Sequence, residues 1–143
     1  MNEEVNKQDI QSHEDVVRLV DAFYERVQRD ALLGPIFGEV AQVDWSAHLP
    51  KMYAFWESVL FGKAGFKGNP LAVHRALAQL TPLTIREFDR WLELFHTAVD
   101  DLFDGNVALE AKRRASAIAV TMLYHVSQDA GSERSLVMTG RVD

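Results

Sequence analysis

The sequence predicts an all-α fold with four long helices and one short helix. Over five stretches of the chain, apolar residues recur at spacings of three and four, which is the period of an amphipathic helix. No run alternates polar and apolar residues, and no Asn-Gly turn separates two β-rich runs. Glycines and prolines mark the breaks between the five stretches. At 143 residues the chain fits one domain.

The first helix is expected to start at Ser12, which with Asp15 forms a capping pattern. It ends before the segment Leu32-Leu33-Gly34-Pro35, because proline disfavours helix at the residue before it. The second helix starts near Asp44 or Ser46 and ends at Gly62. Their inward faces are expected to carry Val16, Leu19, Val20, Phe23, Tyr24 and Val27 in the first helix, and His48, Met52, Phe55, Trp56 and Val59 in the second.

The stretch from residue 62 to 83 is the least regular, with a short helix expected at about 71–80. Thr84 and Glu87 then form a capping box that opens the strongest helix, whose stripe runs from Ile85 to Phe103. The last helix follows the break at residues 104–106. We expect a flexible N-terminal arm over 1–11, one domain over 12–128 and a flexible C-terminal tail over 129–143.

Composition excludes several classes of function. The net charge is −6 with no basic cluster, so nucleic acid is not an expected partner. No apolar run approaches the roughly 20 residues that span a bilayer, and the polar N-terminus is not a secretory signal. The absence of cysteine excludes disulfides, iron–sulfur clusters and covalent haem attachment. We expect a cytoplasmic protein, and a monomer because nothing in the sequence points to a dimer.

Two histidines in aromatic and apolar settings suggest a flat buried cofactor, and specifically non-covalent haem. His74 is the candidate axial ligand, because a short, loop-flanked helix suits a ligand presented beside a large planar group. Taken alone, His74 also fits an ordinary surface histidine. A non-haem metal site is less favoured, because His48 and His74 lack a nearby carboxylate. If His96 were the ligand instead, the alignment of the fourth helix would be wrong.

Three hydrogen-bond donors are expected on inward faces, namely those of Tyr24, His48 and Trp91. In a site of low dielectric they would stabilise a polar ligand bound at the iron. Each also has a simpler interpretation: a core tyrosine with its hydroxyl at the rim, a core histidine bonded to a carbonyl, and a tryptophan that fills the core. Phe37 could wedge the cofactor in place. Lys51 could reach a propionate or be an ordinary solvated lysine.

Together these residues resemble the truncated haemoglobins, and within them the third group. The similarity covers about residues 17–126. It rests on Phe23-Tyr24, Leu33-Gly34-Pro35-Ile36-Phe37, Trp45-x-x-His48, Phe55-Trp56, Gly68-Asn69-Pro70-x-x-x-His74 and Phe88-x-x-Trp91-Leu92-x-Leu94-Phe95. The first two groups usually carry Gly-Gly pairs at helix junctions, and this chain has none.

The resemblance implies a truncated globin-like two-on-two helical sandwich around haem b, with His74 as the proximal iron ligand. It places Tyr24, His48 and Trp91 in the distal pocket and Phe37 and Met52 in its apolar wall. The expected ligands are O2, NO and CO, with an unknown reductase as electron donor.

Strong donors slow O2 release, so redox chemistry on O2, NO or peroxide is favoured over O2 delivery. The sequence leaves open whether the protein is an enzyme with activity like that of an NO dioxygenase or a peroxidase. A haem-based gas or redox sensor and a haem-free helical interaction module are the alternatives.

Overall fold

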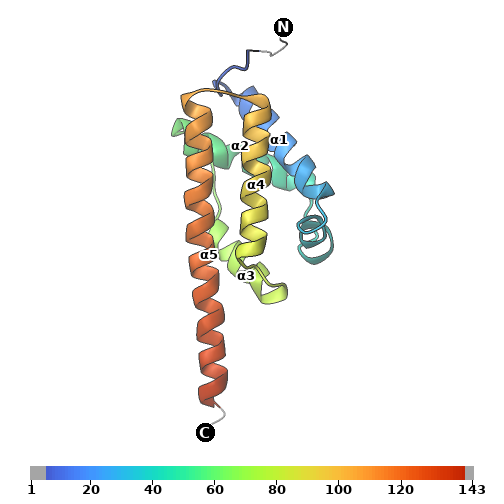
Figure 1. Ribbon diagram of the computed structural model, residues 1–143, viewed down its shortest axis with the longest axis vertical. Coiled ribbons are helices and arrows are strands. Elements are labelled where there is room, and N and C mark those ends of the chain that lie inside the picture. Colours follow the sequence, from blue (N-terminus) through green and yellow to red (C-terminus); the bar gives the residue numbers. More distant parts are fainter. Residues whose placement is uncertain (1–5, 141–143) are drawn as a thin grey trace.

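Helices make up nearly all of the regular structure (Figure 1). The computed structural model describes the backbone over residues 6–140 and side chains over residues 6–130. The α-helices are α1 (His13–Arg29), α2 (Trp45–Phe61), α3 (Pro70–Leu80), α4 (Ile85–Leu102) and α5 (Asn106–Gly140), and a π-helical turn, η1 (Ile36–Val40), precedes α2. The described range contains no strand, so the all-α prediction is confirmed. No helix within that range is long and apolar enough to cross a membrane.

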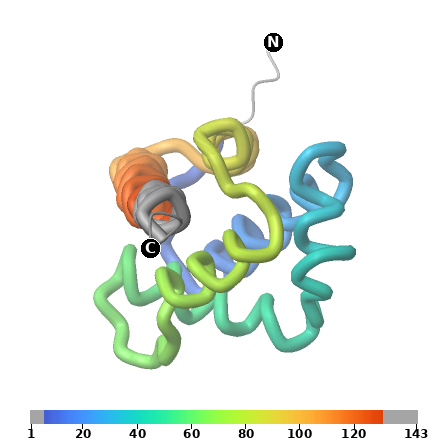
Figure 2. The backbone as a smooth tube through the Cα atoms, turned by 90° about the horizontal axis from the view of Figure 1, so that it is seen from below, coloured from blue at the N-terminus to red at the C-terminus, as the bar shows by residue number. Residues whose placement is uncertain are grey.

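Two helix pairs face each other, as predicted. Helices α4 and α5 run antiparallel, side by side, joined by a short turn (Figure 1). Helix α1 packs on both α2 and α4, while α2 also contacts α5. Viewed along the length of α5, helix α3 lies between the α4–α5 pair and α2 (Figure 2). This arrangement is the two-on-two helical sandwich that the sequence predicts.

The core is concentrated in α1, α4 and α5. The predicted α1 stripe is buried throughout, from Val16 to Val27. Helix α5 faces α4 with small side chains, which let the two axes approach closely. These buried alanines are Ala108, Ala111, Ala115 and Ala119. Helix α4 contributes the larger buried side chains Phe95 and Val99 to the same core.

Helices α2 and α3 contribute much less to the core. Trp56 is the one fully buried residue of α2, and α3 has none. Val73 and Leu80 of α3 are 62% and 71% exposed. Both helices nevertheless carry many apolar side chains. One face of this pair is therefore apolar but not covered by the rest of the described protein.

Asp30 organises the turn after α1, for which the sequence predicts only a short connection. Its buried carboxylate accepts hydrogen bonds from the N–H groups of Leu32 and Leu33 and from Arg90 of α4. Burial raises the pKa of Asp30, but the bonds from Arg90, Leu33 and Leu32 outweigh burial and hold the pKa below its usual value. The ionised Asp30 thus fixes the start of the segment that leads to η1.

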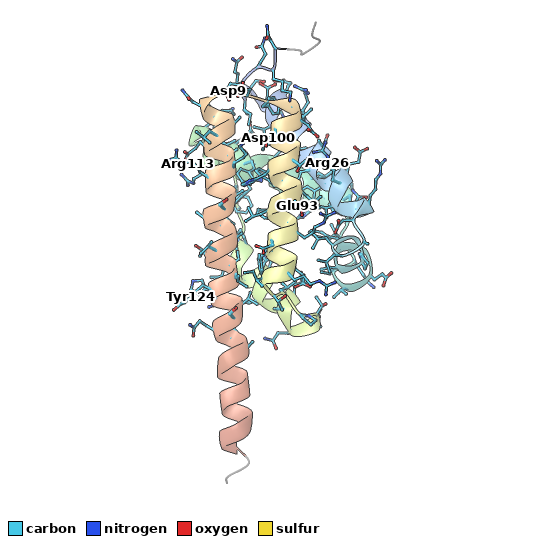
Figure 3. All side chains as sticks on the ribbon, viewed as in Figure 1. Asp9, Arg26, Glu93, Asp100, Arg113 and Tyr124 are labelled. Atoms are coloured by element: carbon cyan, nitrogen blue, oxygen red, sulfur yellow. The ribbon has the colours of Figure 1, made fainter. Side chains whose placement is uncertain are left out.

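Both predicted ends of the domain differ from the expectation. Asp9 and Ile10 belong to the expected N-terminal arm, yet Ile10 is buried and Asp9 accepts hydrogen bonds from Val107 and Ala108 at the start of α5 (Figure 3). These bonds cap α5, whose first N–H groups lack helical partners. At the other end, α5 continues as a helix to Gly140, beyond residue 128. Residues 1–5 and 141–143 of the predicted arm and tail lie outside the described residues.

Candidate functional site

An aromatic cluster at the junction of α1, η1 and α2 brings together three of the predicted site residues. The ring of Tyr24 meets the ring of His48 edge-on at 5.2 Å between centroids and that of Phe37 at 6.0 Å. Trp45 completes the cluster: it stacks on Phe37 at 5.7 Å and lies 5.4 Å from Tyr24. Trp45 belongs to a segment of the family resemblance, but we assigned it no role. Its spacing of three residues from His48 was the available signal.

Local capping places His48 in this cluster. The Asp44 side chain accepts from the N–H of Ser46 and begins α2, and the N–H of His48 bonds to the Asp44 carbonyl at 2.9 Å. Hydrogen bonds from Ser46 lower the pKa of Asp44, which keeps the cap ionised. His48 consequently lies in the first full turn of α2, with Met52 one turn further along.

The Nε2 atom of His48 is fully buried and has no hydrogen-bond partner among the described residues. Burial lowers the pKa of His48, and the charges of Lys51 and His74 lower it further. The ring is therefore neutral near pH 7. An unpaired buried polar nitrogen costs about 1–3 kcal/mol. Such an atom points to a group that would complete the site.

Tyr24 is 5% exposed, and burial raises its pKa far above the usual value. The phenol therefore keeps its proton throughout the neutral range and can act only through an intact O–H. No hydrogen bond of this hydroxyl to a described residue is present. Tyr24 thus resembles His48 in being a buried polar group on the same aromatic cluster.

His74 has one engaged and one available ring nitrogen. Asn69 caps α3 by accepting from the N–H of Ala72, and the Nδ1 atom of His74 lies 2.7 Å from the carbonyl oxygen of Pro70, one turn earlier. A carbonyl only accepts, so Nδ1 must donate, which leaves the lone pair of the neutral ring on Nε2. Metal-bound histidines commonly have this arrangement. The effect of His74 on the pKa of His48 indicates that the two rings are electrostatic neighbours.

Trp91 lies beside the cluster rather than in it. Its ring contacts Phe23 edge-on at 5.6 Å and stacks on Phe95 at 5.8 Å. No ring contact joins Trp91 to Tyr24 or His48 among the described residues. Phe23 lies between Trp91 and Tyr24, and the centroids of the Phe23 and Tyr24 rings are 4.6 Å apart. The structure therefore brings Tyr24 and His48 together and leaves Trp91 one ring away.

The remaining predicted residues lie around the same region. Met52 and Phe37 are half-buried and pack against the core. Lys51 is exposed on α2, and its charge is felt by His48. The alternative ligand His96 is engaged elsewhere, because its Nε2 lies 3.2 Å from the carbonyl oxygen of Lys112. The described residues contain no cluster of three histidine, aspartate or glutamate side chains that could hold a metal ion without haem.

Comparison with known proteins identifies the class to which this fold and site belong. The model of the bacterial-like globin family matches residues 8–126, so the chain is a bacterial-like globin. A group 3 truncated hemoglobin of Campylobacter jejuni is 31% identical over 119 residues, covering 79% of this chain and 91% of that protein. The crystal structure of a group III truncated hemoglobin from Campylobacter jejuni superposes with a TM-score of 0.72 at 29% identity, covering 88% of this chain and 95% of that one. The chain belongs to the truncated haemoglobins of group III.

Globins bind haem and small diatomic ligands such as O2, and the residues present here fit that cofactor. His74 offers a free Nε2 lone pair on one side. His48 has a buried ring nitrogen without a hydrogen-bond partner among the described residues, and the buried Tyr24 carries a hydroxyl in the same aromatic cluster. Helices α2 and α3 supply apolar side chains that the protein itself leaves partly uncovered. An axial ligand, an apolar slot and distal polar groups are what a haem site requires.

Proposed function

We propose that this chain is a haem protein that binds O2 and other diatomic ligands at an iron ligated by His74. The observation that carries the proposal is that two imidazole rings of the site differ in their hydrogen bonding. His74 has its Nδ1 fixed by Pro70 and its Nε2 free, whereas His48 has a buried Nε2 without a partner. When bound, haem supplies an iron centre that takes a diatomic ligand and exchanges electrons with it.

The protein contributes hydrogen bonds on the distal side. Tyr24 holds a permanent O–H donor, and His48 is a neutral ring whose Nε2 can donate to a ligand or accept from it, depending on its tautomer. Trp91, whose ring lies on the far side of Phe23 from Tyr24, would supply a third donor. In a site of low dielectric such donors act strongly on developing negative charge. This favours redox chemistry on O2, NO or peroxide over O2 delivery.

The rest of the proposal concerns how the cofactor is held. Without cysteine the haem is held non-covalently, as haem b. Phe37 and Met52 line its apolar edge, and Lys51 is free to extend from α2 toward a propionate. NO and CO are further ligands, a separate reductase returns electrons to the iron, and the protein acts as a monomer.

The test is an absorption spectrum of the haem-loaded protein in the ferric, ferrous and CO-bound states, beside His74→Ala. We expect a histidine-ligated globin spectrum that is lost in His74→Ala and restored by added imidazole. His13→Ala is the matched control, because His13 lies at the surface and pairs with Glu57. A spectrum indifferent to His74 would refute the assigned ligand. A protein that stays colourless with haem would favour the haem-free interaction module.

A further inference from the structure

Helix α3 carries His74 but is held weakly by packing. It has no fully buried residue, although packing is what usually holds a helix in place. Near its C-terminal end a cavity of about 470 Å³ separates the turn between α3 and α4 from α5, with Ala78, Leu83 and Leu123 in its lining. Apolar packing of α3 on the core therefore rests on partly buried side chains such as Leu77 and Ala78, and polar links can add to it.

Arg75 supplies polar links from α3 to α5. Its Nε lies 3.0 Å from Oδ2 of Asp129, and its NH2 group lies 3.3 Å from Nδ1 of His125. The Nε atom is fully buried, and its N–H is not aligned for a hydrogen bond, so the contact with Asp129 is an ion pair. Among residues 6–130, every hydrogen bond or ion pair that joins α3 to α5 involves Arg75.

The position of Arg75 connects these links to the candidate iron ligand. Arg75 follows His74 directly, and neighbouring residues of a helix point about 100° apart. The Arg75 side chain can therefore reach α5 while the His74 side chain points to a different side of α3. Resting on the haem function proposed above, we propose that Arg75 is a positioning residue, which holds α3 on α5 and so fixes the imidazole of His74 against the iron.

The experiment compares Arg75→Gln, Asp129→Asn and the double variant in the haem-loaded protein. Two quantities are measured: the iron–histidine stretching band of the ferrous form by resonance Raman, and the rate of haem transfer to an excess of apomyoglobin. We expect a lower or broadened band and a haem loss about three- to fivefold faster, which is about 0.7–1.0 kcal/mol. Because Arg75→Gln removes both links and Asp129→Asn removes only one of the same two, the double variant should lose haem no faster than Arg75→Gln alone.

Arg114→Gln is the matched control, because Arg114 pairs with Glu110 within α5 and does not reach α3. It should leave both measurements unchanged. Asp129→Asn tests the same link from the α5 side if Arg75→Gln does not fold. A band and a haem-loss rate that are unaltered in the foldable variants would overturn the inference.

A second experiment, in a variant without His74, distinguishes the positioning of His74 by Arg75 from a general effect of Arg75 on the stability of the protein. In His74→Gly supplied with imidazole, the axial ligand is no longer attached to α3. Arg75→Gln should then leave the iron–imidazole band where it is, whereas a merely structural role would shift it again and refute the inference. If His74→Gly keeps its iron–histidine band without imidazole, the proposed ligand itself is wrong. The failure of the proposed function is thus distinguished from the failure of the role of Arg75.

Discussion

The Nδ1 atom of His74 has a partner, and the Nε2 atom of His48 has none. The chemistry of the site follows from this difference between two identical rings. A fixed Nδ1–H directs a lone pair outward from His74, while desolvation keeps His48 neutral. Tyr24 adds a phenol that burial prevents from ionising. The immediate surroundings thus set the protonation states of His48 and Tyr24 and the hydrogen-bonded nitrogen of His74.

Replacing Tyr24 by phenylalanine tests the distal side. One donor removed from a bound O2 costs about 1–2 kcal/mol, so we expect O2 to dissociate about 5- to 30-fold faster, as measured by stopped-flow displacement with CO. Tyr53→Phe is the control, because the Tyr53 hydroxyl bonds to Asp21 at the surface. The effect should persist from about pH 6 to 9, because the raised pKa keeps Tyr24 protonated. An off-rate equal to that of the control would refute the donor role.

The inward positions of Tyr24 and His48 could be predicted from the sequence, because helical spacing specifies which residues share a face. The separation of Trp91 from them could not, since it depends on Phe23 filling the space between α1 and α4. His74 was compatible with both a ligand and a surface residue, and only the bond to Pro70 decides its tautomer.

Some helix ends in this chain are set by caps within the local sequence, and others by side chains that bond to a distant element. The caps at Ser12 and Thr84 follow local patterns and were predicted, and Asp44 was one of two predicted starts for α2. Asp30 and Asp9 act on backbone or side-chain groups of other elements, which no local pattern reveals. For the same reason the sequence does not predict η1, because the segment that leads to η1 is held by the hydrogen bonds of Asp30.

Replacing Asp30 by asparagine tests the turn that leads to η1. The bonds to Arg90 and the two N–H groups weaken, so we expect the free energy of unfolding at pH 7 to fall by about 1–2 kcal/mol. The pKa of Asp30 is lowered in the folded state, so its contribution is complete above about pH 4 and is lost as pH falls through the folded value.

Urea unfolding of both proteins from neutral to acid pH measures this, and the difference between them should shrink toward low pH. Asp89→Asn is the control, because Asp89 is an exposed carboxylate of α4. A difference that stays constant to about pH 2 would show that the ionised carboxylate is not responsible.

On the scale of the whole molecule, burial divides the fold into two parts. Helices α1, α4 and α5 hold most of the buried residues, whereas many apolar side chains of α2 and α3 remain partly exposed. Haem bound between them would complete the core as well as the site. The sequence predicted the helices and their order, but it could not show this division, which arises from how the helices pack.

We expect haem to change protection against amide hydrogen exchange unevenly. In haem-free protein the amides of α3 and of the first half of α2 should exchange fastest, because local stability follows local burial. Haem should slow their exchange by at least about tenfold and change α4 and the first half of α5 little. Exchange followed by mass spectrometry measures this, with haem-treated His74→Ala as the control. Equal protection of α3 and α4 without haem would contradict this division.

The contact of Asp9 with Val107 has a consequence for the order in which the chain assembles. These residues are 98 positions apart in sequence, so closing them early would require a very large loop. In the folded protein Asp9 lies at the end of the molecule where α5 begins, and α1 packs against α4 (Figure 3). We therefore expect Asp9 to cap α5 late in folding, so that removing this carboxylate by Asp9→Ala speeds unfolding more than it slows folding, as stopped-flow measurements in urea would show.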